Sequence, residues 1–398
     1  MTAVCLERAK AAPLKITLEM PLSSSFPDIF APYLQSTRTL VVYGLPAIEE
    51  LIGVFPNFPR SMPTLRSLEL ERAWDAHWEE TIDPFESFVP ALERLLFTGI
   101  PLFPSLFDLG TLTELTIHDS LFEFPLDTLL DFLEGNHSLK WATLGIHFVD
   151  PSLLISQRKT AMRNQLRCLS INCLDTRDAQ ALISSIPLWK GADLCVHLGT
   201  EHATLSDFLP DVSTAHISNP PSPTSFELTH APWSKHIILS GTDGKLSFSG
   251  LSEVAFADFA VLPLANVREV RLCYWKETTA NTFKPPVFCP SYFPALETLT
   301  VGCTDVLDTL SALLSNSSPS PSLKTIGFLN CDLSEHFMEE LTKFASERQN
   351  IPTSTWLHRV QIVRSDGVFP SVASIRRLRR YVKVVEARIA DKFSTDLT

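Results

Sequence analysis

The sequence has no long apolar run, since no window approaches the ~18 consecutive apolar residues of a membrane-spanning helix. The Met1 end, MTAVCLERAK, carries charges where a signal peptide needs an apolar stretch. Eight cysteines form no CxxC pair and no Cys/His spacing of a zinc module. Positive charge is scarce, and a net charge of -12 argues against nucleic acid as the main partner. We therefore expect a cytoplasmic or nuclear protein with reduced thiols, no metal or cofactor, and no membrane or nucleic-acid partner.

Motifs of catalysis and phosphate binding are also missing. No GxSxG nucleophile elbow occurs, and GTDGKLSFSG (241–250) does not match GxxxxGK[ST]. His118 beside Asp119 suggests an acid–base pair, but its place just after a strand favours a polar surface position. We therefore predict no catalytic residues and no enzyme activity.

What the sequence does contain is a repeated strand. With 45% apolar residues it is too hydrophobic for disorder, and LETLTVGC (296–303) recurs in closely similar form along the chain. The template L-x-x-L-x-L matches nine times, with first positions at Leu65, Leu92, Leu112, Leu139, Leu166, Val267, Leu296, Leu323 and Leu357. Within the two groups of matches the intervals run from 20 to 34 residues, which is typical of leucine-rich repeats or slightly beyond them.

Segments between the strands show apolar residues three or four apart, the pattern of a helix with one buried stripe. They span 46–55, 126–136, 175–186, 305–316 and 333–349. A repeated strand–helix unit buries its apolar face only against its neighbours. The sequence therefore predicts an α/β leucine-rich-repeat solenoid over residues 1–363, with a curved parallel sheet on the concave face and helices outside.

The middle of the chain is less regular. Residues 190–262 hold only poor matches at 192–198, 212–218 and 233–239, and we interpret them as degenerate repeats. HIILSGTDGKLSFSG (236–250) has two alternating segments around Asp-Gly, which predicts a hairpin-like insertion.

Two segments resemble a known family. LKTIGFLNCDLSEHFMEEL (323–341) is similar to a cysteine-containing leucine-rich repeat, with Cys331 at the family's cysteine position, whereas Cys173 and Cys303 fall one residue early. CLERAKAAPLKITLEM (5–20) resembles the junction before the repeats in F-box proteins of mushroom-type fungi. The resemblance implies a substrate receptor of a cullin-RING ubiquitin ligase, in which an F-box binds the Skp1 adaptor.

The chain departs from that family at its start. Nothing before Leu14 has room for the Leu-Pro-x-Glu opening of an F-box, and PLSSSFPDIFAPYL (21–34) resembles it faintly. A Skp1-type adaptor is therefore expected only if an F-box is encoded upstream. Three alternatives stay open: the gene product lost its F-box, the gene model is truncated, or the chain is a free-standing recognition domain.

We expect the chain to be a monomeric protein-recognition scaffold. The rival function is that of a leucine-rich-repeat inhibitor or assembly platform outside ubiquitination, and an enzyme is the least favoured function.

Side chains in a strand point alternately to its two faces, so the residues between the buried template leucines point to the concave wall. An exposed Trp141 would be a binding anchor, or it packs sideways on its neighbours. On the predicted wall of the N-terminal half, Glu69, Glu71 and Glu114 outnumber Arg94. That half is therefore expected to attract a basic segment of the partner. The predicted partner-binding residues are Glu69, Glu71, Arg94, Glu114, His118, Trp141, Glu269, Arg271 and Arg359. Cys173, Cys303 and Cys331 are expected to be small buried residues rather than metal ligands or nucleophiles.

The last residues, 364–398, differ in charge, with a net charge of +4. Apolar residues step by three and four from Ile375 to Ile389, which predicts a basic amphipathic helix that caps the last repeat. A basic patch for an acidic partner or for nuclear import is the alternative.

Overall fold

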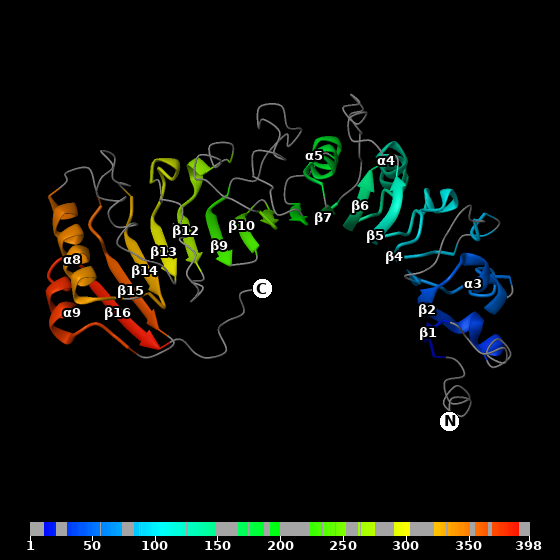
Figure 1. Ribbon diagram of the computed structural model, residues 1–398, viewed down its shortest axis with the longest axis horizontal. Coiled ribbons are helices and arrows are strands. Elements are labelled where there is room, and N and C mark those ends of the chain that lie inside the picture. Colours follow the sequence, from blue (N-terminus) through cyan, green and yellow to red (C-terminus); the bar gives the residue numbers. More distant parts are fainter. Residues whose placement is uncertain are drawn as a thin grey trace. The chain divides into compact units, whose positions relative to one another are not determined.

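The computed structural model of the chain has mixed α/β architecture, as the sequence predicts, with sixteen mostly parallel strands and few helices among the described residues. These residues fall into two compact units, one up to Ala192 and one from Asp193 onward (Figure 1). The structure describes residues 12–20, 30–55, 57–73, 83–86, 88, 90–124, 126–148, 166–173, 175–186, 192–199, 223–231, 234–242, 244–251, 262, 264–274, 290–302, 322–331, 333–350, 355–364 and 368–389.

The first unit is a parallel sheet whose strands follow chain order. They are β1 (Leu14–Glu19), β2 (Thr37–Leu45), β3 (Ser67–Arg72), β4 (Arg94–Thr98), β5 (Glu114–Phe124), β6 (Trp141–Phe148) and β7 (Cys168–Cys173). Between them lie η1 (Ala31–Ser36), α3 (Ile48–Val54), η2 (Pro104–Leu106) and α4 (Leu126–Gly135), and α5 (Thr176–Ser185) follows β7. The helices predicted over 46–55, 126–136 and 175–186 are therefore confirmed.

The second unit ends in a parallel series of the same kind. Its strands are β12 (Glu269–Tyr274), β13 (Thr298–Gly302), β14 (Thr325–Leu329), β15 (Arg359–Arg364) and β16 (Val384–Ile389). With them go η5 (Leu264–Asn266), η6 (Pro290–Tyr292), α8 (Glu335–Gln349) and α9 (Val372–Leu378). The helix predicted over 333–349 is confirmed, and the one over 305–316 lies outside the described residues.

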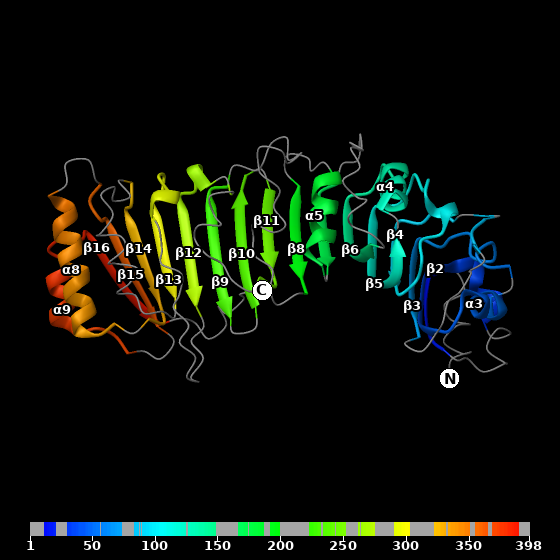
Figure 2. The same ribbon diagram turned by 45° about the horizontal axis from the view of Figure 1, so that its top comes forward.

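The irregular middle begins the second unit with β8 (Asp193–Leu198), β9 (Ser225–Ala231), β10 (Ser234–Gly241) and β11 (Gly244–Ser249). Their spatial order is β8-β11-β10-β9-β12, so sequence order is reversed here. Figure 2 shows β10 running opposite to its neighbours, because it pairs antiparallel with both β9 and β11. The predicted hairpin is confirmed, but β9 was not predicted, and the segment 212–218 is outside the described residues.

The template positions form the core. Every one of the twenty-seven residues at the leucine positions of the nine matches is at most 3% exposed. Because successive side chains in a strand point to opposite faces, the residues between them line the other face of each sheet. We call this second face the open face; on it Arg94 and Glu114 occupy directly opposite positions of β4 and β5.

The predicted basic capping helix over 364–398 is wrong as a single element. Helix α9 ends at Leu378, and β16 then pairs in parallel with β15. Val382, just before β16, and Val385, within β16, are buried, at 2% and 8% exposed. The β-branched valines favour the extended backbone, and the unpaired side of β15 supplies a partner that the sequence pattern alone does not reveal.

Candidate functional site

A hollow of about 390 Å³ lies on the open face of the first unit. Its apolar lining includes Val41 and Leu96, from β2 and β4. Its charged lining comes from all of the strands β1 to β5 or from the residues just before them: Lys15, Arg38, Arg66, Glu69, Glu93, Arg94 and Glu114. The structure thus brings together three of the predicted partner-binding residues, Glu69, Arg94 and Glu114, in one place.

Arg94 and Glu114 form a two-pronged ion pair across β4 and β5. Arg94 Nε lies 2.7 Å from Glu114 Oε2, and Arg94 Nη2 donates to Oε1 over 2.9 Å. This geometry matches the planar guanidinium to both carboxylate oxygens. The charge of Glu114 is therefore already balanced, which weakens the expectation that Glu114 attracts a basic segment.

Two further carboxylates of the hollow also have partners. Arg66 Nε lies 3.7 Å from Glu93 Oε1, and Arg66 Nη1 donates to the Ala91 carbonyl over 2.9 Å. The Tyr43 hydroxyl donates to Glu69 Oε1 over 3.3 Å. The charge of Glu69, with smaller contributions from burial, this hydrogen bond and Glu71, raises the pKa of Tyr43. Tyr43 therefore stays a protonated donor at neutral pH.

The other predicted residues of the first unit border the hollow. Trp141 pairs in register with Glu114, and it is 44% exposed. Trp141 is thus exposed on this wall, as the first of the two alternatives left by the sequence requires, and its role as a binding anchor stays a prediction. Glu71 on β3 and His118 on β5 both align in register with Thr98 of β4. Both residues are half-buried.

The remaining predicted residues belong to the second unit. Glu269 is exposed, Arg271 Nη1 lies 4.0 Å from Glu227 Oε2, and Arg359 Nε lies 3.6 Å from Glu386 Oε1. These pairs join neighbouring strands of the sheet. None of the three predicted residues lines the hollow of the first unit.

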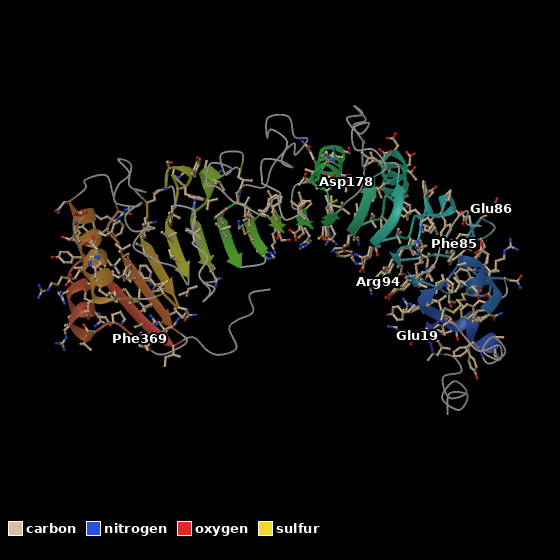
Figure 3. All side chains as sticks on the ribbon, viewed as in Figure 1. Glu19, Phe85, Glu86, Arg94, Asp178 and Phe369 are labelled. Carbon is tan, nitrogen blue, oxygen red and sulfur yellow. The ribbon has the colours of Figure 1, made fainter. Side chains whose placement is uncertain are left out.

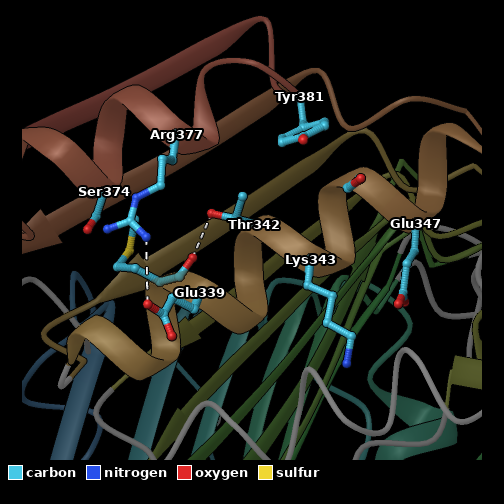
Figure 4. A pocket seen from close by; sticks show the side chains of 9 residues that line it. Glu339, Thr342, Lys343, Glu347, Ser374, Arg377 and Tyr381 are labelled. Carbon is cyan, nitrogen blue, oxygen red and sulfur yellow. Dashed lines mark hydrogen bonds and ion pairs between the residues drawn. The ribbon is translucent and has the colours of Figure 1, made fainter.

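A second hollow, of about 440 Å³, lies between α8 and α9 (Figure 4). Arg377 Nη1 lies 3.6 Å from Glu339 Oε1, and Thr342 donates to the Met338 carbonyl over 2.7 Å. Arg377 Nη2 also lies 3.9 Å from Glu335 Oε2. Since the two ion pairs of Arg377 already join α9 to α8, we interpret this hollow as part of the packing of these helices.

A histidine–serine contact in the middle region was missed by the sequence reasoning. His197 Nδ1 lies 2.5 Å from Ser249 Oγ, on the neighbouring strands β8 and β11. Burial lowers the pKa of His197, and burial together with the charge of His197 lowers that of His236. Among the described residues no carboxylate hydrogen-bonds His197, and Ser249 is 5% exposed. The described residues thus show a histidine–serine pair without a third member, and the 52-residue separation left no sequence signal for it.

The buried cysteines have structural surroundings. Cys331 Sγ lies 3.2 Å from the Val301 carbonyl and is 1% exposed. Cys173 is 2% exposed. The corresponding prediction for Cys303 lies outside the described residues. Cys273, which directly follows the template residue Leu272, is also buried.

Cys173 is predicted to be unreactive until the first unit unfolds. Burial, followed by the charges of Asp178 and Asp175, raises its pKa from 9.0 to about 12. Because thiolate is the reactive form, labelling at pH 8 should be slow in the native protein and fast in denaturant, as mass spectrometry can measure. Stability linked to this thiol is complete below pH 9 and is lost as pH rises toward 12. Equal labelling rates in the native and denatured protein would contradict the assignment.

In the part of the chain that the structure describes, no three His, Cys, Asp or Glu residues are grouped as metal ligands would be. Nor does any helix there have both the length and the apolar character needed to cross a bilayer. No protein-family model matches the chain, and no curated protein matches it significantly.

Proposed function

We propose that this chain is a leucine-rich-repeat solenoid that recognises another protein on the open face of its first unit. The support for the solenoid is the register, since the nine template matches supply the core of successive parallel strands. A stack of such units presents an extended sheet face, and repeat proteins use such surfaces for binding.

The observation that carries the binding proposal is the exposure of Trp141. Trp141 is 44% exposed and pairs in register with Glu114, one of the residues that line the charged hollow. Tryptophan and arginine dominate binding hot spots because a partner buries their large surfaces. Glu114 connects the two features, since it pairs in register with Trp141 and lines the hollow.

The test replaces Trp141 by the photo-crosslinker p-benzoylphenylalanine in the native cell. Irradiation is expected to join position 141 to a defined protein, identified by mass spectrometry. The matched control carries the same crosslinker at Asp131, which is exposed on α4, the helix before β6. An absence of adducts from position 141, or the same adducts from both positions, would contradict the proposal.

The finer proposal is that the bound protein is a ubiquitination substrate. It rests on the resemblance to the substrate-binding half of F-box receptors. Deleting the gene should then raise the steady-state level of the crosslinked protein and remove its ubiquitin conjugates. An unchanged level would favour the rival, a leucine-rich-repeat inhibitor or assembly platform, while leaving the binding proposal intact.

A further inference from the structure

The open face of the first unit carries opposite charges near the two ends of its first strands. At the end formed by the start of β1 and β2, which we call the amino edge, Lys15 and Arg38 line the hollow, and both are exposed. Lys15 pairs in register with Thr39, the residue after Arg38, so the two cations lie on neighbouring strands. Within the described residues neither cation forms an ion pair, unlike Arg66 and Arg94.

The other end of these strands, which we call the carboxyl edge, lies beyond the residues that line the hollow and is acidic. Glu19 pairs in register with Tyr43, and Glu71 lies on the next strand but one from Glu19. Figure 3 shows Glu19 and Arg94 on the side of the strands away from α3 and α4. Glu69 lies beside this edge, where its Oε1 accepts a hydrogen bond of 3.3 Å from the Tyr43 hydroxyl. No ion pair involves Glu19 or Glu71 within the part of the chain described.

The distance between the two edges follows from strand geometry. Lys15 and Glu19 are both in β1, on the face opposite the buried Ile16 and Leu18. Four residues of extended chain span about 13 Å. A ligand that satisfies both edges must therefore carry its own acidic and basic groups about that far apart.

We propose that the occupant of the hollow is an extended protein segment that continues over the open face beyond it, with an acidic residue at the amino edge and a lysine or arginine four residues away at the carboxyl edge. This inference rests on the proposed function and names the chemistry of its ligand. It replaces the purely basic segment expected from the sequence, because Lys15 and Arg38 precede the first template match and did not enter that expectation.

The spacing makes the proposal specific. In an extended segment, residues four apart point to the same side, whereas residues three or five apart point to opposite sides. Only the spacing of four presents both charges to the two edges at the matching distance. Binding should therefore alternate with spacing rather than change smoothly.

The probe is a set of immobilised, end-blocked Thr/Val/Ser peptides that each carry one Glu and one Lys, in both orders, at spacings of three, four or five. Full-length protein is passed over them in biolayer interferometry at low salt. We expect binding to the spacing-four peptides to exceed that to the other two by at least about fivefold, the effect of two exposed ion pairs. Higher ionic strength should remove the difference.

A charge exchange tests which residues are responsible. Lys15→Glu with Arg38→Glu should weaken binding of the Glu/Lys spacing-four peptide and create binding of a Lys/Lys peptide with the same spacing. The matched control is Arg376→Glu with Arg380→Glu, two exposed arginines of the second unit, which gives the same change in net charge. The control should bind like the parent, and circular dichroism should show all proteins folded.

Equal binding at the three spacings, failure of every peptide to bind, or equal effects of the two double variants would each overturn the inference. The crosslinking at position 141 is independent of these outcomes. A crosslinked partner whose binding ignores Lys15 and Arg38 would leave the proposed function standing and remove only this ligand assignment.

Discussion

Replacing Leu299 by aspartate is expected to destabilise the second unit by about 4 kcal/mol or more, because the new carboxylate enters the core without a partner. Leu299 is fully buried between Val270 and Ile326 on the neighbouring strands. That cost approaches the whole stability of a typical domain, about 5–15 kcal/mol. Urea denaturation followed by circular dichroism measures the loss, and hydrogen exchange of residues 298–302 locates it.

The matched control is the adjacent Thr300→Asp. Thr300 lies on the open face and pairs in register with Arg271. The carboxylate of an aspartate at this position therefore meets water and a cation. The stability of this variant should stay within about 0.5 kcal/mol of the parent, as for other surface substitutions. If the two variants denatured at the same urea concentration, the assigned register would be wrong.

Removing the side chain of Asn136 is expected to cost the first unit about 3 kcal/mol, because it leaves buried backbone groups without partners. Asn136 follows α4 and is fully buried. Its Oδ1 accepts from the Leu109 amide over 3.0 Å, and its Nδ2 donates to the Phe132 carbonyl over 2.8 Å and to the Leu106 carbonyl over 3.2 Å. The side chain thus connects the end of α4 with the segment after η2.

Asn136→Ala and Asn136→Asp test this contact separately. The alanine removes every bond, whereas the aspartate retains the acceptor, loses the donors and buries a charge, so both should lower the denaturation midpoint. Ser138→Ala is the control, since Ser138 Oγ makes a bond of 2.6 Å to the Gly110 carbonyl at an exposed position between the same segments. A loss for Asn136→Ala no larger than that for Ser138→Ala would show that the buried bonds contribute little.

Most of the parallel strands were predictable because their information is local. A strand that buries one face in every unit needs apolar residues at fixed positions, so the template marks both the strand and its inner face. The residues at Leu296, Leu299 and Val301 illustrate this, since all three are buried as the template requires. Helices were predicted equally well where their apolar stripe was long, as in 333–349.

The errors occurred where neighbours decide the outcome. The segment after Leu378 has apolar residues three or four apart, as in a helix, yet it pairs as a strand with the free side of β15. The reversed order of β9, β10 and β11 depends on which edges are left to pair, and edge availability is not a property of any one segment. Charge pairing across strands likewise depends on which strands become neighbours and is not a property of any one segment.

The sequence by itself determined the α/β class, the register of the repeated strands and the set of residues on the open face, because alternation and apolar spacing are properties of the chain alone. The tertiary structure alone decided which of those residues still carry an available charge. Arg94 neutralises Glu114 from the next strand, whereas Lys15 and Arg38 keep their charge without an ion pair among the described residues. The physical reason is that an ion pair depends on a distance of a few ångströms between strands, and residues twenty or more positions apart in the sequence reach that distance only when the sheet has formed.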